Sequence, residues 1–164
     1  MPEGSMEPAA FIHYSRSHKK MLIGTTGGML AALKIPAEEA LDDDQEKDDE
    51  EDEKLIVLDT PLEELGRFHT SKIIDIKPCG DSSQFVTIAS DNKFCIWEGT
   101  QHKVLAHIQM PITPSAMDVS ANGSIMFVGT EAGTFRVYDI CDREKPRLLH
   151  QMKFFEEKLP ISQI

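Results

Sequence analysis

The sequence predicts an all-β protein built from a repeated unit, and three observations lead to this prediction. The apolar residues occur in short runs of four to six that are rich in β-branched and aromatic side chains, a pattern typical of strands. Turn-forming Gly, Asn, Asp and Pro residues separate these runs at close intervals. The same order of runs and turns recurs along the chain, which indicates one structural unit per repeat.

The middle copy of the repeat contains three predicted strands in succession. Its apolar runs lie at 73–77, 84–89 and 94–97. Pro78-Cys79-Gly80-Asp81-Ser82 separates the first two runs, and Asp91-Asn92 separates the second from the third. Both separators favour tight turns, so we expect a meander in which neighbouring strands run antiparallel.

The following copy has the same order. Its apolar runs lie at 116–120, 125–129 and 135–138, with turns at Asn122-Gly123 and at 131–133. The third run ends at Tyr138-Asp139, which is 41 residues after Trp97-Glu98 at the end of the corresponding run. A constant spacing of this size indicates a repeat architecture in which each unit forms one small sheet.

The N-terminal segment is a third copy. When residues 116–132 are aligned with the residues 105 positions earlier, 117–120 of the first strand in that copy match 12–15. Leu33 then takes the place of Trp97, 64 residues earlier, which exceeds one repeat by 23 residues. The excess coincides with an acidic tract, and we therefore interpret 37–54 as an insertion in a loop.

This tract accounts for the net charge of −11, because residues 38–53 hold twelve carboxylates and one lysine, while the rest of the chain has sixteen acidic and sixteen basic residues. Its acidic core, 42–53, contains no apolar residue, so we expect it to be disordered. The core can be a solvated loop or an electrostatic contact for a basic partner. The ligand order of an EF-hand calcium loop is missing. The candidate contact residues are Asp42, Asp43, Asp44, Glu46, Asp48, Asp49, Glu50, Glu51, Asp52 and Glu53.

The segment 90–98, Ser-Asp-Asn-Lys-Phe-Cys-Ile-Trp-Glu, resembles the WD-repeat family, whose unit of about 40 to 45 residues is one four-stranded blade of a β-propeller. The resemblance implies a buried hydrogen-bonded set of a His, a Ser or Thr, an Asp and the Trp. His69, Asp91 and Trp97 would supply three members. Ala89 stands in the place of the hydroxyl residue, so we expect that member to be missing.

The next blade departs further from the family pattern. Thr130 would take the hydroxyl place, Tyr138 the Trp place, and Asp139 the place of the closing Asp. Ala132 replaces the turn Asp, and His107 lies a few residues too far upstream. We therefore expect packing, rather than hydrogen bonds, to hold this blade together.

The resemblance defines the expected architecture, which is all-β: a partial WD-repeat propeller with a disordered acidic loop insertion. A flexible N-terminus at 1–10 precedes blades at 11–66, 67–109 and 110–155, and 156–164 begins a further blade. An open arc leaves strand edges and blade faces exposed. We therefore expect a fragment or truncated isoform whose missing blades come from the parent chain or from another chain.

The resemblance also implies a function. WD-repeat propellers are non-catalytic scaffolds that bind other proteins, and the divergent blades with a long acidic loop are similar to cilia- and flagella-associated members of the motile axoneme. The implied partners are axonemal dynein or tubulin-associated components. The alternative is a substrate-recognition or regulatory subunit of an enzyme complex such as a ubiquitin ligase. Such subunits often carry an Arg soon after the Trp-Asp, whereas Arg143 is displaced from that place.

Other function classes find no support in the residues. Cys79, Cys95 and Cys141 lie far apart with no CxxC pair, so neither a disulfide framework nor a zinc site is indicated, and we expect reduced intracellular thiols. Thr25-Thr26-Gly27-Gly28 lacks the GK[ST] of a phosphate loop and is better explained as a hairpin turn. We expect no catalysis, cofactor or metal.

Nucleic acid and membrane partners are also disfavoured. No basic stripe with interleaved aromatic residues occurs, and no apolar stretch approaches the length of a membrane span. The N-terminus lacks a basic region followed by an apolar run. We expect a cytoplasmic protein, placed by the resemblance in the cilium or flagellum.

Overall fold

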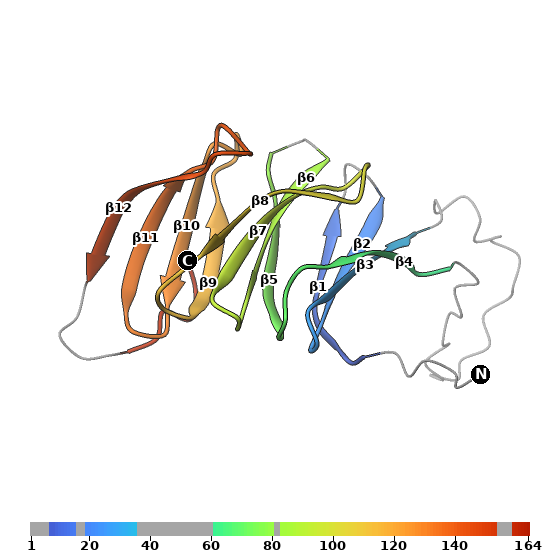
Figure 1. Ribbon diagram of the computed structural model, residues 1–164, viewed down its shortest axis with the longest axis horizontal. Coiled ribbons are helices and arrows are strands. Elements are labelled where there is room, and N and C mark those ends of the chain that lie inside the picture. Colours follow the sequence, from blue (N-terminus) through green and yellow to red (C-terminus); the bar gives the residue numbers. More distant parts are fainter. Residues whose placement is uncertain (1–6, 16–18, 36–60, 81–82, 154–158) are drawn as a thin grey trace, which may run out of the picture.

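The computed structural model describes residues 7–15, 19–35, 61–80, 83–153 and 159–164, and all regular structure in them is β. Three four-stranded antiparallel sheets stand side by side as successive blades (Figure 1). The predicted fold class is confirmed. The acidic insertion predicted at 37–54, with its contact residues, and residues 1–6 of the predicted flexible N-terminus lie outside the described residues.

Each blade consists of four strands that follow one another in the chain. The first blade contains β1 (Ala9–Ser15), β2 (Lys20–Thr25), β3 (Met29–Lys34) and β4 (Glu63–Arg67). The second contains β5 (Ile73–Pro78), β6 (Gln84–Ala89), β7 (Lys93–Glu98) and β8 (Lys103–Gln109). The third contains β9 (Pro114–Val119), β10 (Ile125–Thr130), β11 (Thr134–Asp139) and β12 (Arg147–Lys153).

The predicted turns at 25–28, 91–92 and 122–123 occur where expected, because their residues tolerate the left-handed backbone that tight turns require, whereas Asp81 and Ser82 of the turn predicted at 78–82 lie outside the described residues. Gly28, with φ of +88°, lies in the turn between β2 and β3, and Asn92, with φ of +63°, lies between β6 and β7. Asn122-Gly123 connects β9 to β10, with φ of +71° at the glycine. The hairpin interpretation of Thr25-Thr26-Gly27-Gly28 is therefore confirmed.

The three blades share an irregularity in their strand pairing, which shows that they are copies of one unit. The register between the first and second strands shifts between Ala9 and Phe11, between Ile73 and Asp75, and between Gly129 and Thr130. Ala9 and Ile73 thus occupy equivalent places. The first blade therefore begins before the predicted boundary at residue 11, because main-chain pairing already includes Ala9.

The hydrophobic core lies between the blades. We call the face of a blade that points to the next blade in the chain its forward face, and the opposite face its rear face.

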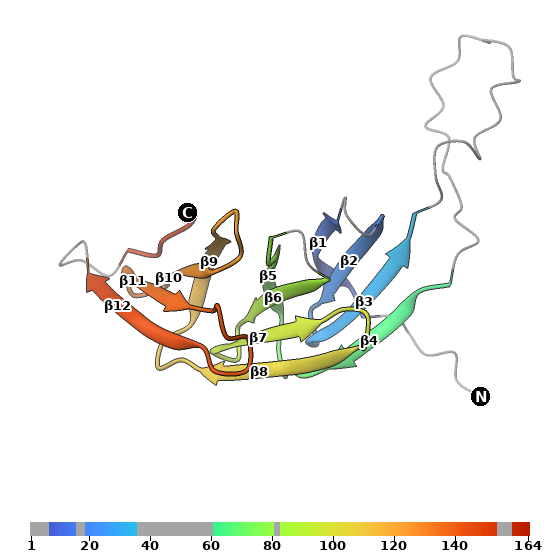
Figure 2. The ribbon, with the colours of Figure 1, turned by 90° about the horizontal axis from the view of Figure 1, so that it is seen from above.

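Figure 2 shows the inner strands β1, β5 and β9 along one side of the arc and the outer strands β4, β8 and β12 along the other. One cluster, including Leu22, Leu30, Phe85 and Trp97, joins the first two blades. Another, including Phe94, Ile96, Met126 and Tyr138, joins the second and third.

Candidate functional site

The middle blade contains a buried hydrogen-bonded set around Thr87. His69 Nδ1 lies 3.2 Å from Asp91 Oδ1, and His69 Nε2 lies 2.7 Å from Thr87 Oγ1. The Trp97 indole Nε1–H donates to the same hydroxyl over 2.9 Å. His69, Thr87 and Trp97 are all at most 1% exposed. The structure therefore brings His69, Asp91 and Trp97 together through a fourth residue, Thr87.

This geometry assigns the protons of the set. Because the indole can only donate, Thr87 Oγ1 accepts from Trp97 and has its own proton free to donate to His69 Nε2. His69 Nδ1 then carries the imidazole proton and donates it to Asp91. Burial lowers the pKa of His69, although the Asp91 carboxylate opposes this shift. The neutral tautomer thus satisfies the hydrogen bonds of all three side chains.

Thr87 corrects the prediction that the hydroxyl member is missing. The sequence comparison assigned its place to Ala89, but Ala89 lies at the end of β6, opposite Lys93. Trp97 lies opposite Phe85 in the β6–β7 pairing. Thr87 lies two residues after Phe85 on β6 and is therefore the diagonal neighbour of Trp97 across the β6–β7 pair. A side chain as long as that of Trp can reach such a diagonal neighbour.

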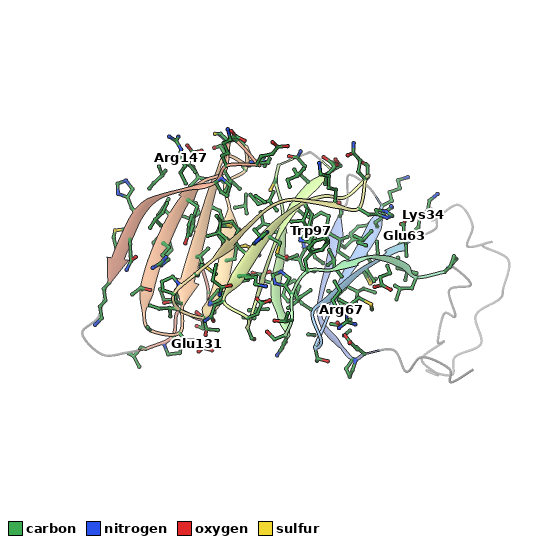
Figure 3. All side chains as sticks on the ribbon, viewed as in Figure 1. Lys34, Glu63, Arg67, Trp97, Glu131 and Arg147 are labelled. Atoms are coloured by element: carbon green, nitrogen blue, oxygen red, sulfur yellow. The ribbon has the colours of Figure 1, made fainter. Side chains whose placement is uncertain are left out.

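Asp91 fixes the loops around this set. Its Oδ2 accepts a hydrogen bond from the Thr70 main-chain N–H over 2.9 Å, and its Oδ1 accepts one from the Lys93 N–H over 3.1 Å. The carboxylate thus holds the segment before β5 against the turn before β7. Figure 3 shows Trp97 between the first and second blades. Taken together, these contacts tie the loops of the middle blade to its core.

The third blade has apolar residues in place of the His and Thr of this set. With the 41-residue spacing, Met110 stands for His69, Val128 for Thr87 and Tyr138 for Trp97, and all three belong to the cluster between the second and third blades. The Tyr138 ring packs edge-on against Phe94 with centroids 5.0 Å apart. Its hydroxyl accepts a hydrogen bond from buried Arg136 over 3.2 Å. This blade is held largely by packing.

Thr130 does not join Tyr138, which corrects its predicted place in the set. Its Oγ1 lies 2.6 Å from Thr134 Oγ1 and accepts from the Thr134 main-chain N–H over 3.2 Å. Thr25, 105 residues earlier, accepts in the same way from the Met29 N–H over 2.9 Å. Both threonines therefore close the turn between the second and third strands, a role that Asp91 has in the middle blade.

The first blade has a different polar set that the sequence interpretation missed. Glu7 accepts hydrogen bonds from the Thr25 hydroxyl over 2.6 Å and from Arg67 Nη2 over 2.7 Å. The hydrogen bond from Thr25 lowers the pKa of Glu7 most, and the hydrogen bond from Arg67 lowers it further. Glu7 was assigned to a flexible N-terminus, and the structure instead fastens it to β2 and β4. The repeated Thr25 and Thr130 positions were the signal that could have indicated such a set.

Asp139 and Arg143 hold the loop that follows β11. Asp139 accepts from the Cys141 N–H over 3.0 Å and from Arg147 Nη2 over 2.7 Å. Arg143 Nε donates to Gln84 Oε1 of the second blade over 2.9 Å, and its Nη1 donates to the Gly123 carbonyl over 2.6 Å. Arg143 therefore joins two blades.

An unusual carboxylate lies on the inner strand β5. Asp75 is 9% exposed, and its Oδ1 accepts a hydrogen bond from the Ile76 N–H over 2.8 Å. Burial raises the pKa of Asp75 to about 6, although Lys77, with its Nζ 4.0 Å from Oδ2, acts in the opposite direction. The nearby Asp118 on β9 raises it further. Ionised Asp75 thus carries an unfavourable charge at the junction of two blades.

Asp75 should therefore produce a measurable pH dependence. Its pKa is raised in the folded protein, so the proton it binds stabilises the fold below about pH 4, and this stabilisation is lost as the pH rises through about 6. Asp75→Asn keeps an acceptor for the Ile76 N–H. We expect the variant to be about 1 kcal/mol more stable than the natural chain at pH 7, with the difference vanishing near pH 4. Urea unfolding of both proteins at pH 7 and at pH 4 measures this difference in the free energy of unfolding. The same difference at both pH values would contradict the raised pKa of Asp75.

The thiols of the described residues differ in accessibility. Cys79 and Cys95 are buried, and burial raises the pKa of Cys79 to about 11 and that of Cys95 to about 12. Neither forms the thiolate needed for nucleophilic attack near neutral pH. Cys141 is exposed. No group of three or more metal-ligating side chains occurs within the described ranges. In those same ranges, no helix has the length and apolar character to cross a membrane.

A hollow lies between the first and second blades. Its floor is apolar and includes Leu22, Leu65 and Phe85, while His13 and Lys20 line it as polar groups. Glu63 of β4 accepts a hydrogen bond from Lys20 over 3.2 Å, so the hollow lies beside the ends of β3 and β4, between which the acidic tract is inserted. We call this side of the arc the insertion edge.

These observations define the class of protein: an arc of stacked four-stranded blades, which is the β-propeller architecture. The structure is similar to the crystal structure of the C-terminal WD40 domain of Sif2, with a TM-score of 0.68 and 15% sequence identity. The similarity covers 98% of this chain and 40% of that chain. The chain therefore has the WD40 propeller fold and spans less than half the length of that structure. No protein-family model matches the sequence, and no curated protein matches it.

Proposed function

We propose that the chain is a non-catalytic scaffold that binds other proteins. The observation that carries this proposal is that several chemically versatile side chains of the described residues are used in structural contacts. His69 is held by Asp91 and Thr87, Arg143 joins two blades, and two of the three cysteines are buried. What the blades offer instead is a rigid surface with loops along both edges, which suits recognition of proteins.

The proposed contact region is the insertion edge. The hollow between the first two blades combines an apolar floor with polar side chains, as protein-binding surfaces do. The ten carboxylates within 42–53 follow β3 and would attract a basic partner over a long range. Within the proposal, the partner is a component of the motile axoneme associated with dynein or tubulin, in a cilium or flagellum, and further blades extend the arc.

Capture from lysates of motile ciliated cells tests this function. The natural chain serves as bait beside a matched variant in which the ten carboxylates of the tract become amides. We expect axonemal proteins on the natural chain, and a purified partner that binds about 10-fold more weakly to the amide variant and at raised salt. If the partner bound equally to the natural chain and to the amide variant, the acidic tract would not be part of the contact region.

The competing function is substrate recognition or regulation within a ubiquitin ligase. The same capture experiment distinguishes it, because ligase adaptors and axonemal proteins do not overlap. The Arg143 guanidinium is already bound to Gln84 and to the Gly123 carbonyl, so it is not free to serve an adaptor. Recovery of ligase adaptors in place of axonemal proteins would nevertheless reject the axonemal assignment.

A further inference from the structure

Two small residues keep the hollow between the first and second blades open. Ala32, on the forward face of the first blade, and Gly99, directly after β7, both line it. The repeat places Ala32 at the position of Ile96, 64 residues later, and Gly99 at the position of Ile140, 41 residues later. Both isoleucines are fully buried in the cluster between the second and third blades. The hollow thus corresponds to a space that two large apolar side chains fill at the next junction.

The glycine cannot easily give way to a residue that closes the hollow. A Cβ atom built on Gly99 would lie 2.7 Å from the Ser83 carbonyl oxygen. The apolar floor of the hollow therefore remains accessible to a side chain from another molecule. One leucine, methionine or phenylalanine suits such a space, because burial of an apolar anchor in a pocket supplies much of the binding energy of an interface.

A carboxylate is held at the rim of the hollow. Glu98, the last residue of β7, accepts hydrogen bonds from Ser83, from the Gln84 amide over 3.1 Å and from the Thr100 hydroxyl over 3.0 Å. These three donors belong to residues that line the hollow. Arg143 in turn binds the Gln84 side-chain oxygen. The hydrogen bonds, above all that from Ser83, lower the pKa of Glu98, so its carboxylate is fixed in place and ionised at neutral pH.

Glu98 lacks the cation that its counterpart in the third blade has. Asp139, 41 residues later, pairs with Arg147 Nη2 over 2.7 Å. Among the residues that the structure describes, no lysine, arginine or histidine forms an ion pair with Glu98. Lys103, opposite Glu98 in the β7–β8 pairing, is exposed and makes no such pair. A fixed carboxylate of this kind is complementary to a cation of a partner.

We propose that the hollow and Glu98 form a two-point recognition site for a protein segment in which Leu, Met or Phe stands beside Arg or Lys. The apolar side chain enters the hollow, and the neighbouring cation pairs with the Glu98 carboxylate. Lys20, which also lines the hollow, is already paired with Glu63 over 3.2 Å, so the charge left unpaired at this rim is negative. The inference rests on the proposed function, because it names the partner chemistry of the insertion edge.

Synthetic peptides test the site on the natural chain. The probes are acetylated and amidated Gly-Gly-X-Arg-Gly-Gly and Gly-Gly-Arg-X-Gly-Gly, where X is Leu, Met or Phe. Control peptides carry Ala at X or Gln in place of Arg. Changes in the carbon-13 methyl signals of Leu22, Ala32 and Leu65 measure binding. We expect the best probe to bind at least about 10-fold more tightly than its alanine control and about 5-fold more tightly than its glutamine control.

Two variants assign the contacts. Glu98→Gln should abolish the preference for Arg over Gln. Its matched control, Glu131→Gln, alters an exposed carboxylate at the opposite edge of the arc (Figure 3) and should leave that preference unchanged. Ala32→Ile introduces the residue of the next junction and should weaken binding of the best probe at least about 10-fold.

Either of two results would overturn the proposal: equal binding of the apolar and alanine peptides, or an undiminished preference for Arg in Glu98→Gln. The first comparison uses the natural chain, so it decides the apolar contact even if Ala32→Ile fails to fold. Capture of axonemal proteins tests the proposed function separately. Capture without apolar-dependent peptide binding would reject this site and leave the scaffold function standing. Peptide binding of the expected pattern without such capture would support the site and reject the axonemal assignment.

Discussion

Trp97→Ala should lower the free energy of unfolding by about 4 kcal/mol, the largest effect expected of any single substitution in this chain. The Trp97 side chain is 1% exposed. Its ring stacks on Phe85 at 5.9 Å and meets the edge of Phe68 at 5.3 Å. Truncation leaves a cavity between the first and second blades, and the Thr87 hydroxyl loses its donor.

Urea unfolding followed by circular dichroism measures this loss, because Trp97 is the single tryptophan and its removal eliminates the fluorescence signal. Trp97→Phe is the matched control: it keeps an aromatic ring and removes the indole N–H. We expect it to cost about 2 kcal/mol. If both variants lost the same free energy, the hydrogen bond rather than the packing would be the main contribution of Trp97.

Thr87→Val should cost about 2 to 3 kcal/mol although it changes the side-chain volume very little. The reason is that the Thr87 hydroxyl serves two buried groups, His69 Nε2 and Trp97 Nε1. Valine has nearly the same shape, so both nitrogens would remain buried without a partner. Leaving such groups unpaired costs their full desolvation energy.

Two further variants show whether the polar set acts as a unit. Thr100→Val exchanges the same groups at an exposed site and should change stability by less than about 0.5 kcal/mol. The double variant His69→Met with Thr87→Val reproduces the apolar residues found in the third blade, Met110 and Val128. We expect it to lose less than the sum of the two single variants, because it removes both partners of one hydrogen bond. Strict additivity would show that the two residues are not coupled.

Local patterns in the sequence predicted the strands and their turns. Hairpin turns depend on a few adjacent residues, so Gly28, Asn92 and Gly123 could be assigned without knowledge of the fold. The 41-residue spacing between Trp97 and Tyr138 indicated the blade as the repeating unit. The strand order within each sheet follows, because short turns connect only neighbouring antiparallel strands.

The hydrogen-bond partners of the polar side chains were harder to predict from the sequence. The alignment of the repeats matched Ala89 with Thr130, because it compares only the positions of residues along equivalent strands. Thr87 was therefore not recognised as the hydroxyl member of the set. Hydrogen bonding depends instead on which atoms face each other across two strands. Likewise Glu7 precedes the first predicted strand, and nothing in its neighbourhood indicated that Arg67, sixty residues later, would bind it.

By itself the sequence determined the fold class, the repeat and the residues available for the buried set. Only the tertiary structure decided that Thr87 completes this set, that apolar Met110 and Val128 stand at the places of His69 and Thr87 in the third blade, and that Glu7 binds Arg67. The physical reason is range. Strand and turn formation follow from neighbours along the chain, whereas hydrogen-bond partners and face-to-face packing are set by register and by the stacking of blades, which bring together residues far apart in sequence.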